Sequence, residues 1–355
     1  MKAAMKAVVF EGAGRAGVRD REPPPFGSGD VLVKVAVSGV CGTDRAIVLG
    51  EFPALRGVVL GHEAAGEVAA TGPGVGSVAP GDRVVVNPTY YCSRCRPCRR
   101  GLPAHCAAKE GREVGVDRDG TMAGFAVVPE HFVHRLPAGV SFRRGALVEP
   151  LACVLNNLRA ARPRWDDRVL VLGAGPIGAL CAMVLASRGA RVALAERDPG
   201  RAEIARGLLP PTVRVQAPEE AARARGPAPD VVVDTTGSAP GGVLDAVAPG
   251  GTVVVMGERE AAVAAVPLRA LVTRGIRLVG AGPYRPADFE LAVELARDLP
   301  LERLVTHVLP LERFTEALAL LAVAPAGDGG GGDGYGGDGY SAMKVLLTPD
   351  GSPVS

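Results

Sequence analysis

Between about Leu151 and Val279 the chain alternates short apolar runs with Ala-rich amphipathic segments, and this alternation limits the possible folds more than any other feature. The apolar runs occupy 169–172, 192–195, 231–233, 253–256 and 278–279. Strands that alternate with helices predict a parallel sheet with helices on both faces, because each return to the sheet needs a crossover. We therefore expect a doubly wound α/β domain over residues 151–284.

The remaining sequence has a different pattern of apolar and turn-forming residues. Up to about Val148, short Val-rich runs such as 31–37 and 83–86 are separated by Gly, Pro and Asp, a pattern typical of a β-rich domain. Apolar spacing predicts two helices, over 291–296 and 314–321, before a last strand over 343–347. We expect that strand to return to the first domain, which would comprise 1–150 and 285–355. Segment 327–341, almost all Gly, Asp and Tyr, predicts a mobile loop.

A glycine-rich turn follows the first strand of the predicted α/β domain. Gly173, Gly175 and Gly178 form a G-x-G-x-x-G motif that opens an uncharged helix, and an acid, Glu196, ends the next apolar run. This context is typical of a dinucleotide site, where glycines admit the pyrophosphate and the acid binds the ribose hydroxyls. A carboxylate repels a 2′-phosphate, so NAD is favoured over NADP. The candidate cofactor residues are Gly173, Gly175, Pro176, Ile177, Gly178, Glu196, Arg197, Arg201 and Thr235.

Four cysteines at C-x2-C-x2-C-x7-C spacing stand in the first domain: Cys92, Cys95, Cys98 and Cys106. Four thiolates so close in the chain can surround one Zn²⁺ as a tetrahedron without a long loop closure. Because such a site has no open coordination position, we expect it to be structural.

A second set of possible zinc ligands is spread along the same domain. Cys41, the Gly61-His62-Glu63 triplet and Glu149 supply thiolate, imidazole and carboxylate groups. Mixed ligands that leave a position for water or substrate are typical of a catalytic zinc. The sequence therefore predicts two zinc ions per chain.

Taken together, these motifs give the chain a clear resemblance. It resembles the zinc-dependent medium-chain dehydrogenases, and within them the polyol, sugar and threonine dehydrogenase branch, over almost its whole length. The shared motifs are Cys-Gly-Thr-Asp from Cys41, Gly-His-Glu from Gly61, the cysteine quartet, Glu-Pro-Leu-Ala from Glu149, the glycine turn and Thr306-His307.

The resemblance implies a GroES-like β-rich catalytic domain joined to a Rossmann domain. Cys41 and His62 would bind the catalytic zinc, and Glu63 and Glu149 would complete the shell, one directly and the other directly or through water. Asp44 would accept a hydrogen bond from the second nitrogen of His62. Thr43 would bind the reacting hydroxyl. Many relatives carry a relay histidine where this chain has Ala46, so the proton would leave through water or Glu149.

The implied reaction is reversible hydride transfer between NAD and a secondary alcohol of a polyol, sugar, cyclitol or amino sugar. Two alternatives within the family are an aldose 1-dehydrogenase and an L-threonine-type dehydrogenase. An alternative of another class is a zinc-ribbon module that binds nucleic acid through arginines beside the quartet. A net charge of +2 and 4% aromatic residues argue against that module.

Composition and the remaining residues indicate where the protein acts, with which partners, and where three further side chains lie. Cysteines that are metal-bound or free indicate a reducing compartment, which favours the cytoplasm. The uncharged stretch 169–187 is long enough to cross a membrane, but its glycines and proline divide it into a strand, a turn and a helix. We therefore expect no membrane partner. The resemblance implies a homodimer or homotetramer. Cys153 and Cys181 are expected in the core, and Lys344 at the surface.

Overall fold

The computed structural model describes residues 4–109, 111–223, 226–237, 242–257, 263–321 and 342–351. The predicted loop 327–341 lies outside these residues. The chain divides into two compact units. Unit 1 contains the described residues of Met1–Ala152, Arg285–Tyr335 and Lys344–Ser355, and unit 2 contains those of Cys153–Tyr284 and Gly336–Met343.

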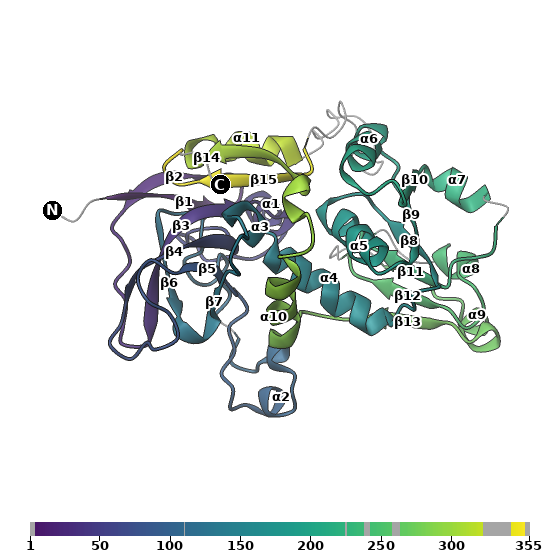
Figure 1. The fold of residues 1–355 in the computed structure, drawn as a ribbon, viewed down its shortest axis with the longest axis horizontal. Helices are drawn as coiled ribbons and strands as arrows, with labels where there is room; N and C mark the ends of the chain where they lie inside the picture. Colours follow the sequence, from purple (N-terminus) through teal and green to yellow (C-terminus); the bar gives the residue numbers. More distant parts are fainter. Residues whose placement is uncertain are drawn as a thin grey trace. The chain divides into compact units, whose positions relative to one another are not determined.

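Unit 2 is built on a six-stranded parallel sheet with the order β10-β9-β8-β11-β12-β13. In chain order its strands run 3-2-1-4-5-6, the order of a doubly wound dinucleotide-binding fold. The strands are β8 (Arg168–Leu172), β9 (Arg191–Ala195), β10 (Arg214–Gln216), β11 (Val231–Asp234), β12 (Thr252–Val255) and β13 (Arg277–Gly280) (Figure 1). The predicted α/β class is confirmed.

Helices connect these strands, because a parallel strand cannot follow its neighbour through a tight turn. They are α5 (Pro176–Ser187), α6 (Pro199–Leu208), α7 (Pro218–Arg223), α8 (Val243–Ala246) and α9 (Leu268–Arg274). The uncharged stretch 169–187 forms β8, a turn and α5, as its apolar run and glycine motif predicted. Within the described residues, none of the helices combines the length and the apolar character that a membrane crossing requires.

Unit 1 contains a two-stranded antiparallel hairpin and a larger mixed sheet. The hairpin pairs β1 (Met5–Gly12) with β2 (Arg15–Arg21). The larger sheet has the order β14-β15-β3-β4-β5-β7, and β6 also pairs with β3. Its strands are β3 (Asp30–Gly39), β4 (Glu63–Thr71), β5 (Arg83–Val86), β6 (Phe125–Pro129), β7 (Val133–Arg135), β14 (Val305–Pro310) and β15 (Lys344–Thr348).

The helices described in unit 1 are short, with four to ten residues each. They are α1 (Gly42–Leu49), α2 (Arg96–Arg99), α3 (Phe142–Gly145), α10 (Pro286–Leu295) and α11 (Phe314–Leu321). Single 3₁₀ turns occupy Pro103–His105, Glu130–Phe132, Leu301–Leu304 and Leu311–Arg313. The remaining helix, α4 (Val148–Ala161), begins in unit 1 and ends in unit 2.

The last strand of the chain returns to the first unit, as predicted. β15 pairs in parallel with β14 and antiparallel with β3, so that it is an interior strand of the sheet. Figure 1 shows it in yellow beside β14 and α11. All five residues of β15 are buried. A valine-rich core that includes Val31, Val33 and Val84 fills the space on one side of this sheet.

Candidate metal centres and dinucleotide turn

Cys41, His62 and Glu63 lie together in unit 1, although 20 residues separate the first two. One possible ligand atom from each lies within 4.8 Å of the other two. Cys41 is the N-cap of α1, Glu63 is the first residue of β4, and His62 directly precedes it. Thiolate, imidazole and carboxylate form a donor set suited to Zn²⁺. This group can therefore hold a metal ion.

Asp44 forms hydrogen bonds to both segments that carry the possible metal ligands. Its Oδ2 accepts a hydrogen bond from the Cys41 backbone N–H at 2.9 Å, and its Oδ1 accepts one from Gly61 N–H at 3.2 Å. The expected bond to the His62 ring is longer, since Asp44 Oδ1 and His62 Nδ1 are 3.9 Å apart. At that distance the contact is electrostatic rather than a hydrogen bond. Asp44 is fully buried, and this burial raises its pKa.

The environment of the His62 ring favours its protonated form when no metal is present. Burial lowers the pKa of His62, but the hydrogen bond and charge of Cys41, then the charges of Asp44 and Glu149, raise it well above the usual value. Cys41, Asp44 and Glu149 therefore favour positive charge on the His62 ring.

Glu149 and Thr43 flank the group without belonging to it. Glu149, in the first turn of α4, is 9% exposed, and its charge raises the pKa of His62. Its carboxylate does not join Cys41, His62 and Glu63 in the group whose ligand atoms all lie within 4.8 Å of one another. Thr43 Oγ1 lies 3.8 Å from Cys41 Sγ. The structure brings three predicted ligands together and leaves the fourth nearby.

Lys344 is the residue that the sequence interpretation misplaced. The expectation of a surface lysine is wrong, because Lys344 is 2% exposed and forms an ion pair with Glu63. Its Nζ also donates to the Val40 carbonyl at 3.0 Å. A usable signal was present in the sequence: Lys344 opens the apolar run Val-Leu-Leu, and a charge there must be buried with a partner.

The cysteine quartet forms a compact second cluster in unit 1. Cys95 Sγ lies 3.3 Å from Cys98 Sγ and 3.9 Å from Cys106 Sγ. Sulfurs bound to one zinc at about 2.3 Å are about 3.8 Å apart in a tetrahedron, so the spacing suits that ion. Backbone N–H groups of Cys92 and Ala108 approach Cys106 Sγ at 3.3 and 3.4 Å. Such bonds stabilise thiolate charge.

The four thiols differ in their electrostatic surroundings. Backbone N–H groups, first that of Arg94, lower the pKa of Cys92 to about 6. The N–H of Cys98 has the same effect on Cys95, whose pKa is lowered. Burial raises the pKa of Cys98 to about 12. Four ionised sulfurs in this cluster therefore need a bound cation, which is how a structural zinc site couples to folding.

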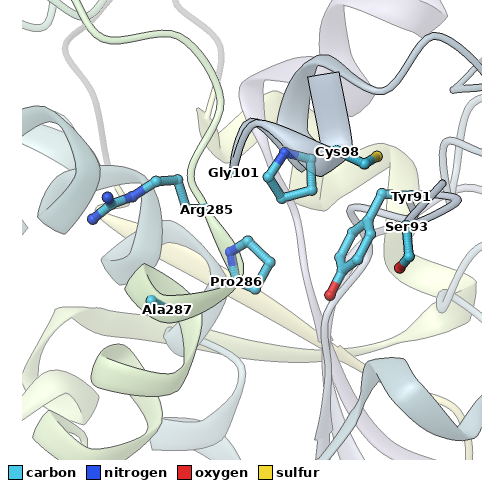
Figure 2. A pocket seen from close by; sticks show the side chains of 8 residues that line it. Tyr91, Ser93, Cys98, Gly101, Arg285, Pro286 and Ala287 are labelled. Carbon is cyan, nitrogen blue, oxygen red and sulfur yellow. The ribbon is translucent and has the colours of Figure 1, made fainter. Parts of the chain in front are cut away.

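A hollow of about 370 Å³ lies beside the quartet rather than beside Cys41. Figure 2 shows Tyr91, Ser93 and Cys98 on one side of it and Pro286 and Ala287, at the start of α10, on the other. The Tyr91 hydroxyl is 2.5 Å from His131 Nε2. None of the residues that line this hollow belongs to the Cys41 cluster.

In unit 2 the glycine turn has the backbone geometry that its motif predicts. Gly173 has φ of +91°, in the left-handed region. A Cβ at Gly178 would lie 1.9 Å from the Gly173 carbonyl oxygen, so only glycine allows α5 to approach β8. At Gly175 a Cβ would meet only Arg201 Nη1, at 3.8 Å, which leaves room for a phosphate at the N-terminus of α5.

Glu196 and Thr235 border this turn. Oε2 of Glu196 accepts from Ala174 N–H at 2.7 Å, and its Oε1 accepts from Asp198 N–H at 2.9 Å. Thr235 Oγ1 donates to the Leu172 carbonyl at 2.7 Å. Pro176 and Ile177 form the first turn of α5, and Arg197 is exposed after Glu196. The predicted dinucleotide residues thus surround one turn at the carboxyl ends of β8 and β9.

The other cysteines and histidines have mostly the structural environments expected of them. Cys181 is fully buried, whereas Cys153 is only half-buried, so the expectation of a core position for Cys153 is wrong. His134 packs on Phe289 with ring centroids 5.0 Å apart, and burial lowers its pKa. His307 Nδ1 lies 3.1 Å from Thr306 Oγ1.

Two clusters of possible metal ligands in unit 1 and a dinucleotide turn in unit 2 together define a zinc- and nicotinamide-dependent oxidoreductase. Comparison with known families agrees. Residues 27–138 match the alcohol dehydrogenase GroES-like domain, and residues 143–320 match the glucose dehydrogenase C-terminus. These two regions cover most of the chain.

Individual relatives point the same way. The chain is 34% identical over 344 residues to "Probable D-xylulose reductase A" of Arthroderma otae, covering 90% of this chain and 94% of that one. A zinc-binding dehydrogenase of Sinorhizobium meliloti 1021, solved with NADP, superposes with a TM-score of 0.85 at 28% identity, covering 98% and 100%. An Escherichia coli CFT073 alcohol dehydrogenase, solved with NADH, gives 0.84 at 27%, covering 97% and 99%. The chain belongs to the zinc-dependent medium-chain dehydrogenase family.

Proposed function

We propose that this protein oxidises a secondary alcohol of a polyol, sugar, cyclitol or amino-sugar substrate and transfers the hydride to NAD. The observation that carries the proposal is the grouping of Cys41, His62 and Glu63 within 4.8 Å in a family of zinc-dependent dehydrogenases. The similarity to a D-xylulose reductase supports the substrate class, since reduction of that ketone is the reverse of oxidising a polyol. It favours a polyol dehydrogenase over the aldose and threonine alternatives.

Separate residues of this chain would hold the metal, bind the substrate hydroxyl and release its proton. Cys41, His62 and Glu63 would hold the catalytic zinc, and Glu149 would complete its surroundings. When bound, zinc supplies a Lewis acid that polarises the substrate oxygen. Thr43, beside Cys41, would accept a hydrogen bond from the substrate hydroxyl and start the proton relay. Because Ala46 offers no titratable group, the proton would pass to solvent through water or through the Glu149 carboxylate.

The second zinc and the dinucleotide would occupy the other two clusters. Cys92, Cys95, Cys98 and Cys106 would hold a structural zinc. NAD would lie with its pyrophosphate over Gly175 and its ribose hydroxyls toward Glu196, the residue that disfavours a 2′-phosphate. Related structures contain NADP in one case and NADH in another, so the preference rests on Glu196 and not on the comparisons.

We also propose that the protein is a homodimer or homotetramer in the cytoplasm and acts without nucleic acid or membrane. The support for oligomers is a set of exposed aliphatic side chains on α9 and on the edge strand β13 of unit 2. Leu268 and Val272, one turn apart on α9, are 72% and 82% exposed, and Leu278 of the edge strand β13 is 37% exposed. Large exposed aliphatic groups at an edge strand favour a subunit contact. Light scattering on wild type and Val272→Glu tests this.

The experiment that tests the reaction is a panel of polyols, aldoses, aminocyclitols and simple alcohols, followed by NADH absorbance. We expect turnover with at least one polyol. Cys41→Ser and His62→Ala should abolish it while NADH binding persists, and Cys153→Ser is the matched thiol control that should retain it. Near-full activity of Cys41→Ser would refute the metal assignment. Turnover of simple alcohols alone would refute the substrate class.

A further inference from the structure

A second hollow in unit 1 is lined by four arginines and shares no lining residue with either metal cluster. It has a volume of about 470 Å³ and lies between the β1–β2 hairpin and the segment that contains Arg56. Its base is formed by Val9 and Phe10, which are 4% and 6% exposed. The charged groups that line it are Arg15, Arg19, Arg21, Arg56 and Glu11.

Strand geometry explains why three of these arginines share a surface. Residues 15, 19 and 21 of β2 are separated by even numbers, so their side chains lie on one face of the strand. The intervening acid, Asp20, has odd spacing and is paired in register with Lys6, so its side chain lies on the opposite face. The arginine row is therefore not neutralised by its neighbour in sequence.

Gly17 separates Arg15 from Arg19 on this face, and it carries no side chain. A Cβ at this position would already be 3.4 Å from Arg19 Nη1, so a larger residue would press on the Arg19 guanidinium. The row therefore has no side chain packed between these two arginines.

The fourth arginine reaches this row through backbone pairing. Phe10 N–H donates to the Val58 carbonyl at 2.9 Å, and Gly57 N–H donates to the Phe10 carbonyl at 2.7 Å. Arg21 Nη2 donates to the Gly57 carbonyl at 2.6 Å. These three bonds hold the segment with Arg56 against the hairpin, so the position of Arg56 beside the row is set by the fold.

The charges in the hollow do not balance. Glu11 is fully engaged by Arg19, which donates from Nε and Nη2 to its two oxygens at 2.8 Å each. Arg21 donates to a carbonyl, and Arg15 and Arg56 form no ion pair with any acid among the residues the structure describes. Four guanidinium groups and one carboxylate leave three positive charges. Like charges gathered in one hollow repel one another unless an anion joins them.

We propose that this hollow binds a small molecule that carries two or more phosphate groups. Guanidinium groups present planar forks of N–H donors that match phosphate oxygens in pairs, and their charge cannot be lost by deprotonation. Three uncompensated charges exceed what one phosphate requires. Arg15 and Arg56 supply guanidinium groups that form no ion pair within the described residues, and the Arg21 guanidinium is held in the same hollow by its bond to the Gly57 carbonyl. A sugar bisphosphate and a nucleoside diphosphate share this chemistry.

Calorimetric titration of the full-length, NADH-saturated protein tests the proposal, since NADH occupies the dinucleotide turn. The probes are fructose 1,6-bisphosphate and ADP. We expect saturable binding of at least one of them, and the tighter probe identifies the source. Arg15→Gln/Arg56→Gln should weaken that binding at least about tenfold. The matched control, Arg188→Gln/Arg269→Gln, removes the same charge from two exposed positions and should change it less than about twofold.

Three results would overturn the proposal. The first is the absence of saturable binding by either probe. The second is an equal loss in the Arg15/Arg56 and control variants, which would mean that only net charge matters. The third is binding of tricarballylate, or of a short single-stranded RNA, at least as tight as that of the phosphates and lost in the same variant. None of these outcomes depends on the dehydrogenase activity, so the proposed function is tested separately.

Discussion

The ammonium group of Lys344 forms an ion pair with the carboxylate of Glu63, and both side chains are almost fully buried, at 3% and 2% exposure. The pair joins β15 to the first residue of β4, which directly follows His62 in the chain. Burial alone lowers the pKa of Lys344, but the charges of Glu63, Cys41 and Glu149 raise it above the usual value. Lys344 thus supplies positive charge at the edge of the candidate metal centre.

Removal of Lys344 should be costly. Lys344→Met would leave the Glu63 carboxylate buried without its partner, and we expect a loss of about 3–5 kcal/mol in the free energy of unfolding. Lys34→Met, at an exposed lysine on β3, is the control and should cost less than about 0.5 kcal/mol. Urea unfolding of both variants measures the difference. Equal stability of Lys344→Met and wild type would show that the pair is not important.

Replacement of Gly178 should damage unit 2 selectively. Gly178→Ala would place its Cβ 1.9 Å from the Gly173 carbonyl oxygen, which forces α5 away from β8. We expect about 1–3 kcal/mol of destabilisation and weaker NADH binding. At Gly207 of α6 a Cβ would meet nothing within 4 Å, so Gly207→Ala should be neutral or stabilising by up to about 1 kcal/mol. Thermal unfolding and NADH fluorescence titration distinguish them, and similar behaviour of the two variants would refute the packing argument.

Glu196 should control coenzyme choice. Glu196→Gln retains an oxygen that can accept from the backbone but removes the charge that repels a 2′-phosphate. The ratio of kcat/KM for NAD to that for NADP should fall by about tenfold. Glu203→Gln, at an exposed acid on α6, is the matched control. An unchanged ratio in Glu196→Gln would place the coenzyme preference elsewhere.

The two metal clusters should lose zinc independently. Wild type should contain about two zinc ions per chain, and Cys95→Ser should contain about one. Cys153→Ser, which removes a half-buried thiol outside both clusters, should retain two. Elemental analysis after dialysis gives these numbers. Two zinc ions in Cys95→Ser would contradict the assignment of the quartet.

An ion pair within unit 1 should make stability depend on pH. The guanidinium of Arg144 donates from Nε to Glu302 at 2.5 Å, and this hydrogen bond lowers the pKa of Glu302 below 4.5. Because the folded pKa is lowered, the stabilisation is present above about pH 4.5 and is lost as the pH falls through the folded value. The carboxylate is 37% exposed, so we expect only about 0.5–1 kcal/mol.

The measurement compares the unfolding free energy of wild type and Glu302→Gln from pH 7 down to pH 3.5. Their difference should be constant near neutral pH and should shrink at acidic pH, because protonation makes the wild-type carboxyl similar to the amide. Any zinc lost on acidification affects both proteins alike. A difference that grows as the pH falls would have the wrong sign for this mechanism.

The sequence by itself determined the features that depend on neighbours in the chain. The glycine turn at Gly173–Gly178 follows from steric limits on a few consecutive residues, and the spacing of Cys92 to Cys106 brings four sulfurs together through one short loop. Strand-and-helix alternation determined the parallel sheet, since a crossover is the only connection that parallel strands permit.

Only the tertiary structure decided which distant side chains meet. Lys344 pairs with Glu63 because β15 enters the sheet between β14 and β3, and strand pairing across the whole chain is not encoded in either segment alone. Arg56 joins Arg15 because the backbone of residues 57–58 pairs with β1. Burial of charge depends on such long-range contacts, whereas turns and ligand spacings depend on local sterics, which a sequence displays directly.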